Sequence, residues 1–306
     1  MRRIVIALRM GGVGTICMVV SALFYGAMSI SVKLSIPYVT VWQTGMGRFA
    51  LGGILIPILA WPLRLDLLGK GRWMLITRGL SATGGFLLLV QAFKTIPLSV
   101  GMILFYLWPV FACLLSSWVA GEPTTKREWP FVLGALAGTA LILWPDRAGP
   151  GVNVGHFLAL GASFFTGLAV ILIRRLGRTN NAFTIYFYQC LAGVLFCLGP
   201  LLAQAHPILP VTRVGWVGLI AVAAFAMAGQ VLMNQGMKHL SASKTGVLMM
   251  LEVIVAATFG IVYLAETLSI RLLFGAGLIL GCGVALIILP MHHNPHIKTS
   301  PPDKGQ

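Results

Sequence analysis

The sequence predicts an all-α membrane protein in which ten transmembrane helices form two inverted five-helix repeats. Three observations lead to this prediction. Of the 306 residues, 58% are hydrophobic and only 9% are charged. The hydrophobic residues are grouped in ten stretches, most of them long enough to cross a bilayer. Polar residues of the first half of the chain also recur at fixed spacing in the second half.

The composition excludes an ordinary soluble protein, because about a quarter of the residues in such a protein are charged. The mean hydropathy of +0.92 agrees with this. The formal net charge of +15, from 22 Lys+Arg against 7 Asp+Glu, could suggest a nucleic-acid-binding protein. The basic residues lie instead in short clusters between apolar stretches, without a nucleic-acid motif. We therefore expect no nucleic-acid partner, and we expect the lipid bilayer to surround the chain.

The expected helices follow from apolar stretches of about 20 residues. In the first half, Pro37, Pro62, Pro97 and Pro123 mark the connections between stretches. The basic N-terminus has the charge pattern of a signal peptide, but its apolar run is too long for one, so we expect it to be retained as a helix. The expected spans, in order, are 11–31, 41–60, 73–92, 98–119, 130–145, 154–173, 183–203, 214–236, 243–264 and 271–290.

The distribution of basic residues predicts the orientation. With both termini in the cytoplasm, sixteen basic residues fall inside, Arg78 among them, and only five fall outside, while Arg48 stays within a span. Basic residues accumulate on the cytoplasmic side of membrane proteins. Together with the absence of eukaryotic sorting signals, this predicts a bacterial inner-membrane protein with cytoplasmic termini.

The repeat is visible in polar residues, which apolar composition alone would not align. A shift of 144 residues places Gln91-Ala-Phe-Lys94 on Gln235-Gly-Met-Lys238 and Gly121-Glu122 on Ala265-Glu266. A shift of 141 residues places Gly26 on Gly167. Each repeat holds five helices, an odd number, so the two halves face opposite ways in the membrane. The expected units are a first repeat at 10–145, a second repeat at 152–290 and a cytoplasmic tail at 291–306. Inverted repeats are typical of secondary transporters, whose site lies near mid-membrane.

Paired motifs in the two halves resemble a known family. The first half contains Ala92-Phe-Lys-Thr-Ile-Pro-Leu-Ser99 and Leu107-Trp-Pro-Val110, and the second half contains Gly236-Met-Lys-His-Leu-Ser-Ala-Ser243 and Leu251-Glu-Val253. Their order and duplication resemble the EamA-type members of the drug/metabolite transporter superfamily over roughly residues 12 to 290. The resemblance implies alternating access without ATP. Family members often carry Glu-Pro in the ninth helix, where this chain has Glu252-Val253, so we expect a weaker bend there than at Pro109.

Glu252 is the acid that lies deepest in an expected span. It lies about nine residues inside the ninth span, roughly 14 Å deep. A charge at the membrane centre costs about 2.5–3.5 kcal/mol on insertion scales, so the carboxyl must pair, protonate or face water. One interpretation is a protonation or ligand site, with desolvation favouring the neutral acid. The other is a neutral carboxyl that joins helices.

Further polar groups in the spans are also candidate substrate or coupling residues. Arg48 could bind a carboxylate or phosphate of the substrate, or tie a helix to backbone carbonyls. Gln230 and Asn234 share one face of the eighth helix, and Gln91 and Gln235 are repeat equivalents. These amides could contact a polar ligand or bond between helices.

Aromatic residues complete the candidate site. Trp108 is the repeat equivalent of Glu252 and could line a central cavity or pack between helices. Tyr106 and Tyr25 are further candidates, although aromatic residues also form interfacial belts.

The sequence indicates a transporter and not an enzyme, because no catalytic or nucleotide-binding motif is present. The five cysteines form no metal-ligand spacing. His292, His293 and His296 could bind metal, but they are more typical of a charged, proline-rich terminal tail, so we expect neither metal nor cofactor. The expected function is secondary-active export of an amino acid or related metabolite, with protons as the candidate coupling ion. Uptake of a vitamin, nucleoside-type or S-adenosylmethionine-like compound is one alternative. An intramembrane enzyme or a non-transporting scaffold is another.

Overall fold

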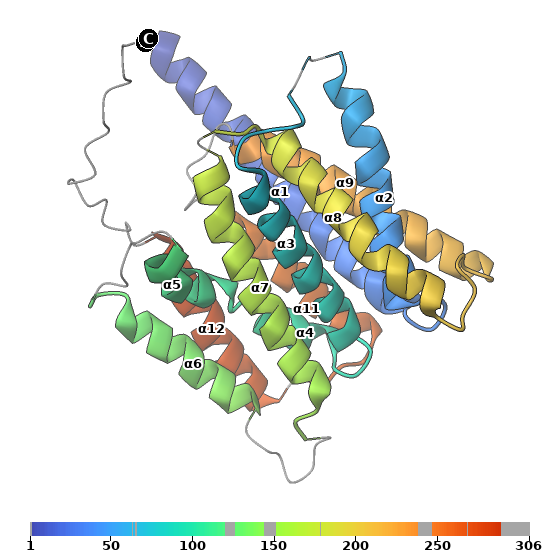
Figure 1. Cartoon of the computed structure of the whole chain (residues 1–306). Coiled ribbons are helices and arrows are strands. Elements are labelled where there is room, and N and C mark those ends of the chain that lie inside the picture. Colours follow the sequence, from blue (N-terminus) through green and yellow to red (C-terminus); the bar gives the residue numbers. More distant parts are fainter. Residues whose placement is uncertain are drawn as a thin grey trace.

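A computed structural model gives the fold of the chain (Figure 1). It describes residues 2–62, 64, 66–119, 126–143, 151–177, 179–237, 247–267 and 269–288, and the side chains of 2–11, 117, 119, 174, 234 and 237 are outside this description. The expected tail at 291–306 and most of the linker between the repeats are also outside it.

The described residues form helices and connecting turns without a strand, which confirms the all-α prediction. The helices are α1 (Arg2–Ser35), α2 (Val41–Ala60), α3 (Arg72–Ala92), α4 (Leu98–Phe105), α5 (Trp108–Val119), α6 (Trp129–Leu143), α7 (Val154–Leu176), α8 (Ala182–Ala203), α9 (Arg213–Met237), α11 (Leu251–Tyr263) and α12 (Ile270–Ile288).

The helices match the expected spans in number. Seven helical segments are long and apolar enough to cross a bilayer, one of them the combined α4–α5 segment Leu98–Ser116. Trp129–Leu143 and Val247–Tyr263 are shorter apolar helices. The remaining helix is α2, which has 20 residues and carries Arg48. The chain is therefore a multi-pass membrane protein.

Helix packing follows the repeat. The helix α1 packs against α9, and its counterpart α7 packs against α3. In the same way α1 contacts α11 while α7 contacts α5, and α2 contacts α9 while α8 contacts α3. Two further pairs, α2 with α8 and α6 with α12, join equivalent helices of the two repeats and lie at opposite edges of the bundle (Figure 1). Each main contact that a helix of one repeat makes thus has an equivalent contact in the other repeat.

The fourth span of the first repeat is broken between α4 and α5 at Tyr106 and Leu107. Proline lacks a backbone N–H, so Pro109 cannot donate to the carbonyl of Phe105 as a continuous helix would require. The chain instead makes tighter turns, in which the N–H of Leu107 bonds to the carbonyl of Leu104 at 3.1 Å.

The second repeat is broken at the equivalent residue, Met250. The N–H of Val253 bonds to the carbonyl of Met250 at 3.1 Å, which leaves the carbonyl of Met249 without its usual helical partner. The interruption persists here without a proline and spans one residue, against two in the first repeat. The weaker bend expected in this half stays a prediction. Gly283 of α12 lies beside both breaks: a Cβ added there would come within 4 Å of atoms of Met250, Pro109 and Tyr106.

The connections separate into two ends of the bundle. At one end, Nζ of Lys33 donates to the carbonyls of Phe93 and Ile96 at 2.6 and 2.8 Å. At the other end, the N–H of Lys70 donates to the Asn180 side chain at 2.6 Å. Loops expected outside therefore meet one another, as do loops expected inside. Which end faces the cytoplasm stays a prediction.

Arg78 corrects the count of cytoplasmic basic residues. It lies in the second turn of α3 and is only 6% exposed, so it is a buried membrane residue rather than a loop cation. The excess of basic residues at that end remains large without it.

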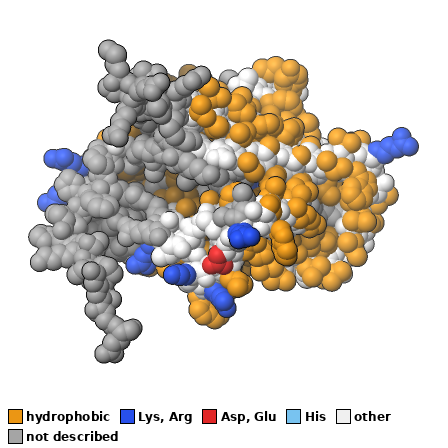
Figure 2. All heavy atoms as spheres, turned by 90° about the horizontal axis from the view of Figure 1, so that it is seen from above, with side chains coloured by type: hydrophobic (Ala, Val, Ile, Leu, Met, Phe, Trp, Pro, Cys, Tyr) orange, Lys and Arg blue, Asp and Glu red, His pale blue; other side chains and the backbone are white. Residues whose placement is uncertain are grey.

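The molecular surface fits a bilayer. Figure 2 views the end that carries the α2–α3 connection, where Lys and Arg side chains surround an acidic one and hydrophobic side chains cover the flank. Trp61, Trp73 and Trp118 are exposed near this end, and Tyr263 is exposed near the other. Aromatic side chains favour the two membrane–water interfaces.

The orientation can be tested by labelling single cysteines in a cysteine-free background. Leu68 lies in the α2–α3 connection and Leu209 in the α8–α9 connection, and both are exposed. We expect an impermeant thiol reagent to label Leu209→Cys in intact cells and Leu68→Cys only after permeabilisation. The reverse result would contradict the orientation.

Glu266 caps the N-terminus of α4 from the other repeat. Its carboxylate accepts hydrogen bonds from the Ser99 N–H at 3.0 Å, the Ser99 hydroxyl at 2.6 Å and the Leu98 N–H. The first N–H groups of a helix lack intrahelical partners, so this carboxylate stabilises α4 and joins the two halves.

We expect Glu266→Ala to lower the stability of the detergent-solubilised protein by about 1 kcal/mol, the typical cost of losing a cap. Thermal unfolding measures this, and Thr267→Ala at the neighbouring exposed position is the control. Equal melting temperatures for the two variants would show that the cap contributes little.

Candidate functional site

The carboxyl of Glu252 lies where the two helix breaks meet. It is 6% exposed and is held by α1 and by the α4–α5 break. The hydroxyl of Ser29 donates to Oε1 at 3.4 Å, and the hydroxyl oxygen of Tyr106 lies 2.8 Å from Oε2. The carboxyl of the second repeat is thus bound by two side chains of the first.

Tyr106 also contacts the second break directly. Its hydroxyl oxygen lies 2.6 Å from the carbonyl of Met249, the carbonyl that the break leaves without a helical partner. A phenol has one proton, and a carbonyl can only accept. When Tyr106 donates to Met249, the 2.8 Å contact with Glu252 must be a hydrogen bond that the carboxyl donates. The arrangement therefore fits a protonated Glu252, while an ionised Glu252 would compete with Met249 for the Tyr106 proton.

A second polar pair lies one helical turn from Ser29. The hydroxyl of Tyr25 donates to Oε1 of Gln230 in α9 at 2.8 Å, and both side chains are buried. Tyr25 and Ser29 share a face of α1 because they are four residues apart. The structure therefore brings four predicted residues, Glu252, Tyr106, Tyr25 and Gln230, into one interior region between α1, α4, α9 and α11.

Two equivalent glycines allow close helix packing beside the two breaks. A Cβ at Gly26 of α1 would lie 2.7 Å from the side chain of Val255 and 3.5 Å from the carbonyl of Glu252. A Cβ at Gly167 of α7 would lie 2.9 Å from the carbonyl of Trp108, the equivalent of Glu252. The helices α1 and α7 therefore each approach the helix that follows a break, α11 and α5 respectively, as closely as a glycine permits.

Arg48 of α2 lies beside this region without bonding to Glu252. It is 8% exposed, and its guanidinium carbon lies 4.1 Å from the centre of the Phe86 ring, a cation–π contact. Its Nη1 contacts the sulfur of Met28 at 3.3 Å, and its Nε has no hydrogen-bond partner. Among the described residues, Arg48 makes no hydrogen bond to a backbone carbonyl, the structural alternative that the sequence left open.

Arg78 of α3 is a buried cation that sequence reasoning missed. Its Nη1 donates to Oε1 of Gln189 at 2.6 Å and to the carbonyl of Ile185 at 3.3 Å, while its Nε has no partner. Gln189 is the repeat equivalent of Arg48. A signal was present, because Arg78 falls six residues inside an expected span.

The other candidate residues lie apart from this region or outside the description. Trp108 is half-buried in the first turn of α5 and packs against the hydrophobic core. Gln91 and Gln235, near the ends of α3 and α9, are exposed. Asn234 lies on α9, but its side chain is outside the described residues.

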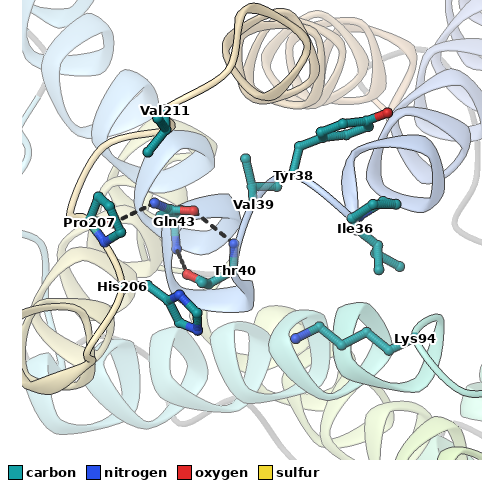
Figure 3. Close-up of a pocket in the computed structure, with 10 residues that line it drawn as sticks. Ile36, Tyr38, Val39, Thr40, Gln43, Lys94, His206, Pro207 and Val211 are labelled. Carbon is teal, nitrogen blue, oxygen red and sulfur yellow. Dashed lines mark hydrogen bonds between the residues drawn. The ribbon is translucent and has the colours of Figure 1, made fainter.

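A pocket of about 300 Å³ opens at the end predicted to be outside (Figure 3). Its wall consists of the α1–α2 connection, the start of α2, Lys94 and the loop after α8. Gln43 is fixed by donating to the carbonyl of Pro207 at 2.7 Å, and the side chains of Lys94 and His206 extend into the space below it. The pocket does not include Glu252, so it is an outer compartment and not the central region.

A metal site in the described part of the chain would require several ligating side chains close together. No three His, Cys, Asp or Glu residues there form a group that could hold a metal ion.

Comparison with known proteins identifies the family. The chain is 24% identical over 273 residues to the pseudopaline exporter CntI of Pseudomonas aeruginosa, covering 89% of this chain and 95% of that protein. It is 22% identical over 264 residues to mouse solute carrier family 35 member G1, covering 82% and 72% respectively. A solved crystal structure shares the fold with a TM-score of 0.63 at 18% identity, covering 91% of this chain and 97% of that one.

The match to the family as a whole covers both repeats. Residues 12–144 and residues 153–289 each match the EamA-like transporter family. Together these segments span most of the chain and correspond to α1–α6 and α7–α12. The chain belongs to the EamA-like transporter family.

Proposed function

We propose that the chain is a secondary-active carrier that exports a small organic metabolite, an amino acid or related compound, in exchange for protons. The family establishes a transporter rather than an enzyme, which leaves a small-molecule substrate and the lipid bilayer as its partners. The similarity to a metabolite exporter supports the direction. The proposal places the protein in a bacterial inner membrane with both termini in the cytoplasm and repeats at 10–145 and 152–290.

The observation that best supports the coupling of transport to protons is the position of Glu252. A titratable group that controls alternating access must lie where the repeats move against each other. The Glu252 carboxyl belongs to the second repeat and is bound by Tyr106 and Ser29 of the first. Each change of its proton therefore alters bonds between the two repeats.

The proposed cycle uses the single proton of Tyr106. With Glu252 protonated, the carboxyl donates to Tyr106, Tyr106 donates to Met249, and the two breaks are joined. With Glu252 ionised, Tyr106 turns its proton to the carboxylate and releases the Met249 carbonyl. The protonated form crosses the membrane interior without a net charge, and a cationic side chain such as Arg48 compensates the ionised form.

Uptake stays the alternative direction, because the same coupling residue can serve flux either way. A scaffold role is less favoured, because a buried acid costs free energy that packing alone would not require. We retain Trp108 and Arg48 as proposed cavity and substrate residues. Gln91 and Gln235 are exposed near the helix ends, so we propose that they contact substrate where it enters or leaves the carrier.

The test is Glu252→Gln, which keeps the shape of the side chain and its ability to donate to Tyr106 but cannot titrate. In proteoliposomes, with a substrate identified by counterflow against a labelled metabolite panel, we expect pH-gradient-driven accumulation to be lost. Exchange without a gradient should be at least partly retained, because the neutral form is preserved.

Glu252→Asp is the matched control, because it can still titrate and should retain pH-driven accumulation at a lower rate. Wild-type pH dependence in Glu252→Gln would show that the coupling role is wrong and that the residue is a structural acid.

A further inference from the structure

We propose that the transported molecule is a small organic anion whose carboxylate or phosphate oxygens are bound by Arg78 together with Arg48. The inference rests on the proposed transport function and names the class of substrate. It assigns a binding role to Arg78 and locates that role on the side of the interior formed by α2, α3 and α8.

The first argument is the unused hydrogen-bonding capacity of two buried guanidinium groups. Arg48 is 8% exposed and Arg78 is 6% exposed. A guanidinium carries five N–H donors. Nη1 of Arg78 contacts two oxygens, Nη1 of Arg48 contacts only a thioether sulfur, and Nε of both has no partner. Buried polar groups normally have partners, so these donors point to an acceptor that binds here.

The second argument is charge. Neither arginine forms an ion pair with any described residue. The buried acid in this part of the interior is Glu252, and its carboxyl is engaged with Tyr106 and Ser29. A buried charge without a counter-ion is costly. A bound anion would supply the missing charge and the missing acceptors, and Arg suits bidentate binding of carboxylate and phosphate.

The third argument is that Arg78 and the face of α2 that carries Arg48 both pack against one short stretch of α8. Arg78 bonds to the carbonyl of Ile185 and to the side chain of Gln189. Gly52 lies one turn after Arg48 on the same face of α2, and a Cβ there would lie 2.5 Å from the sulfur of Cys190. Residues 185–190 of α8 thus contact both Arg78 and the face of α2 that carries Arg48.

The outer pocket, like the interior around Arg48 and Arg78, is lined by basic side chains. Figure 3 shows the side chains of Lys94 and His206 directed into it, and the Lys94 ammonium forms no hydrogen bond within the described part of the chain. The pocket opens beside the start of α2, the helix that carries Arg48 deeper in the membrane. An anion that moves between the pocket and the interior would meet cations at both levels.

The test is ligand-induced thermal stabilisation of the purified full-length protein. The probes are succinate and glutamate as carboxylates, glycerol 3-phosphate as a phosphate, glutamine as a neutral analogue and putrescine as a cation. We expect at least one anion to raise the melting temperature of the wild type, while glutamine and putrescine do not. The anion that acts distinguishes carboxylate from phosphate recognition.

The variants separate binding from structure. Arg78→Gln should weaken the response to the anion at least tenfold in concentration, and Arg78→Lys should retain part of it. Arg72→Gln is the matched control, because Arg72 lies on the same helix but is exposed. If Arg78→Gln lowers the melting temperature without ligand and leaves the anion response unchanged, Arg78 is a structural tie and the inference is wrong.

Counterflow in proteoliposomes with the same probes separates this inference from the proposed function. Exchange of glutamine or putrescine at a rate that Arg78→Gln does not change would leave the carrier function standing and refute the anionic substrate. Stabilisation by an anion through Arg78 without exchange of any probe would support the anion site and contradict transport of that anion.

Discussion

The hydroxyl of Tyr106 joins the two repeats at the centre of the structure, because it contacts two polar groups beside the helix break of the second repeat. One is the Met249 carbonyl, which the break separates from its helical donor, and the other is the Glu252 carboxyl. Buried polar groups of this kind are tolerated in a membrane only when they find partners. Tyr106 itself stands at the first break, so a residue from the break in the first repeat satisfies the carbonyl that the second break frees.

The two repeats share a backbone but differ in the side chains at their common centre. Tyr106 and Trp108 occupy the places that Met250 and Glu252 hold in the second repeat, and Arg48 occupies the place of Gln189. In the proposed cycle, the symmetry of helix packing supplies two related conformations in which the repeats exchange roles. The asymmetry of the polar groups confines the buried acid at this centre to the second repeat, so the proposed cycle needs only one proton to bias the exchange.

The sequence was sufficient for what depends on local pattern: the ten spans, the repeat and the burial of Glu252. It was insufficient for contacts between helices that lie far apart in the sequence. The partners of Glu252 come from α1 and α4, and a pattern along one helix does not show which serine or tyrosine will meet it. The break at Met250 lacks the proline that would have signalled it. The charge count places Arg78 with the cytoplasmic cations, although it falls inside the expected span 73–92. The acceptors that bind it, the Gln189 side chain and the Ile185 carbonyl, lie on α8, and the pattern along α3 does not reveal them.

The measurement that tests the central claim most directly is the infrared difference spectrum of the purified protein across a pH titration. A protonated Glu252 that donates to Tyr106 should give a neutral-carboxyl band near neutral pH. That band should be missing in Glu252→Gln and shifted in Tyr106→Phe, where the acceptor is lost. A wild-type protein without any band that depends on Glu252 near neutral pH would contradict the claim, because the carboxyl would then be ionised and could not join the two repeats as described.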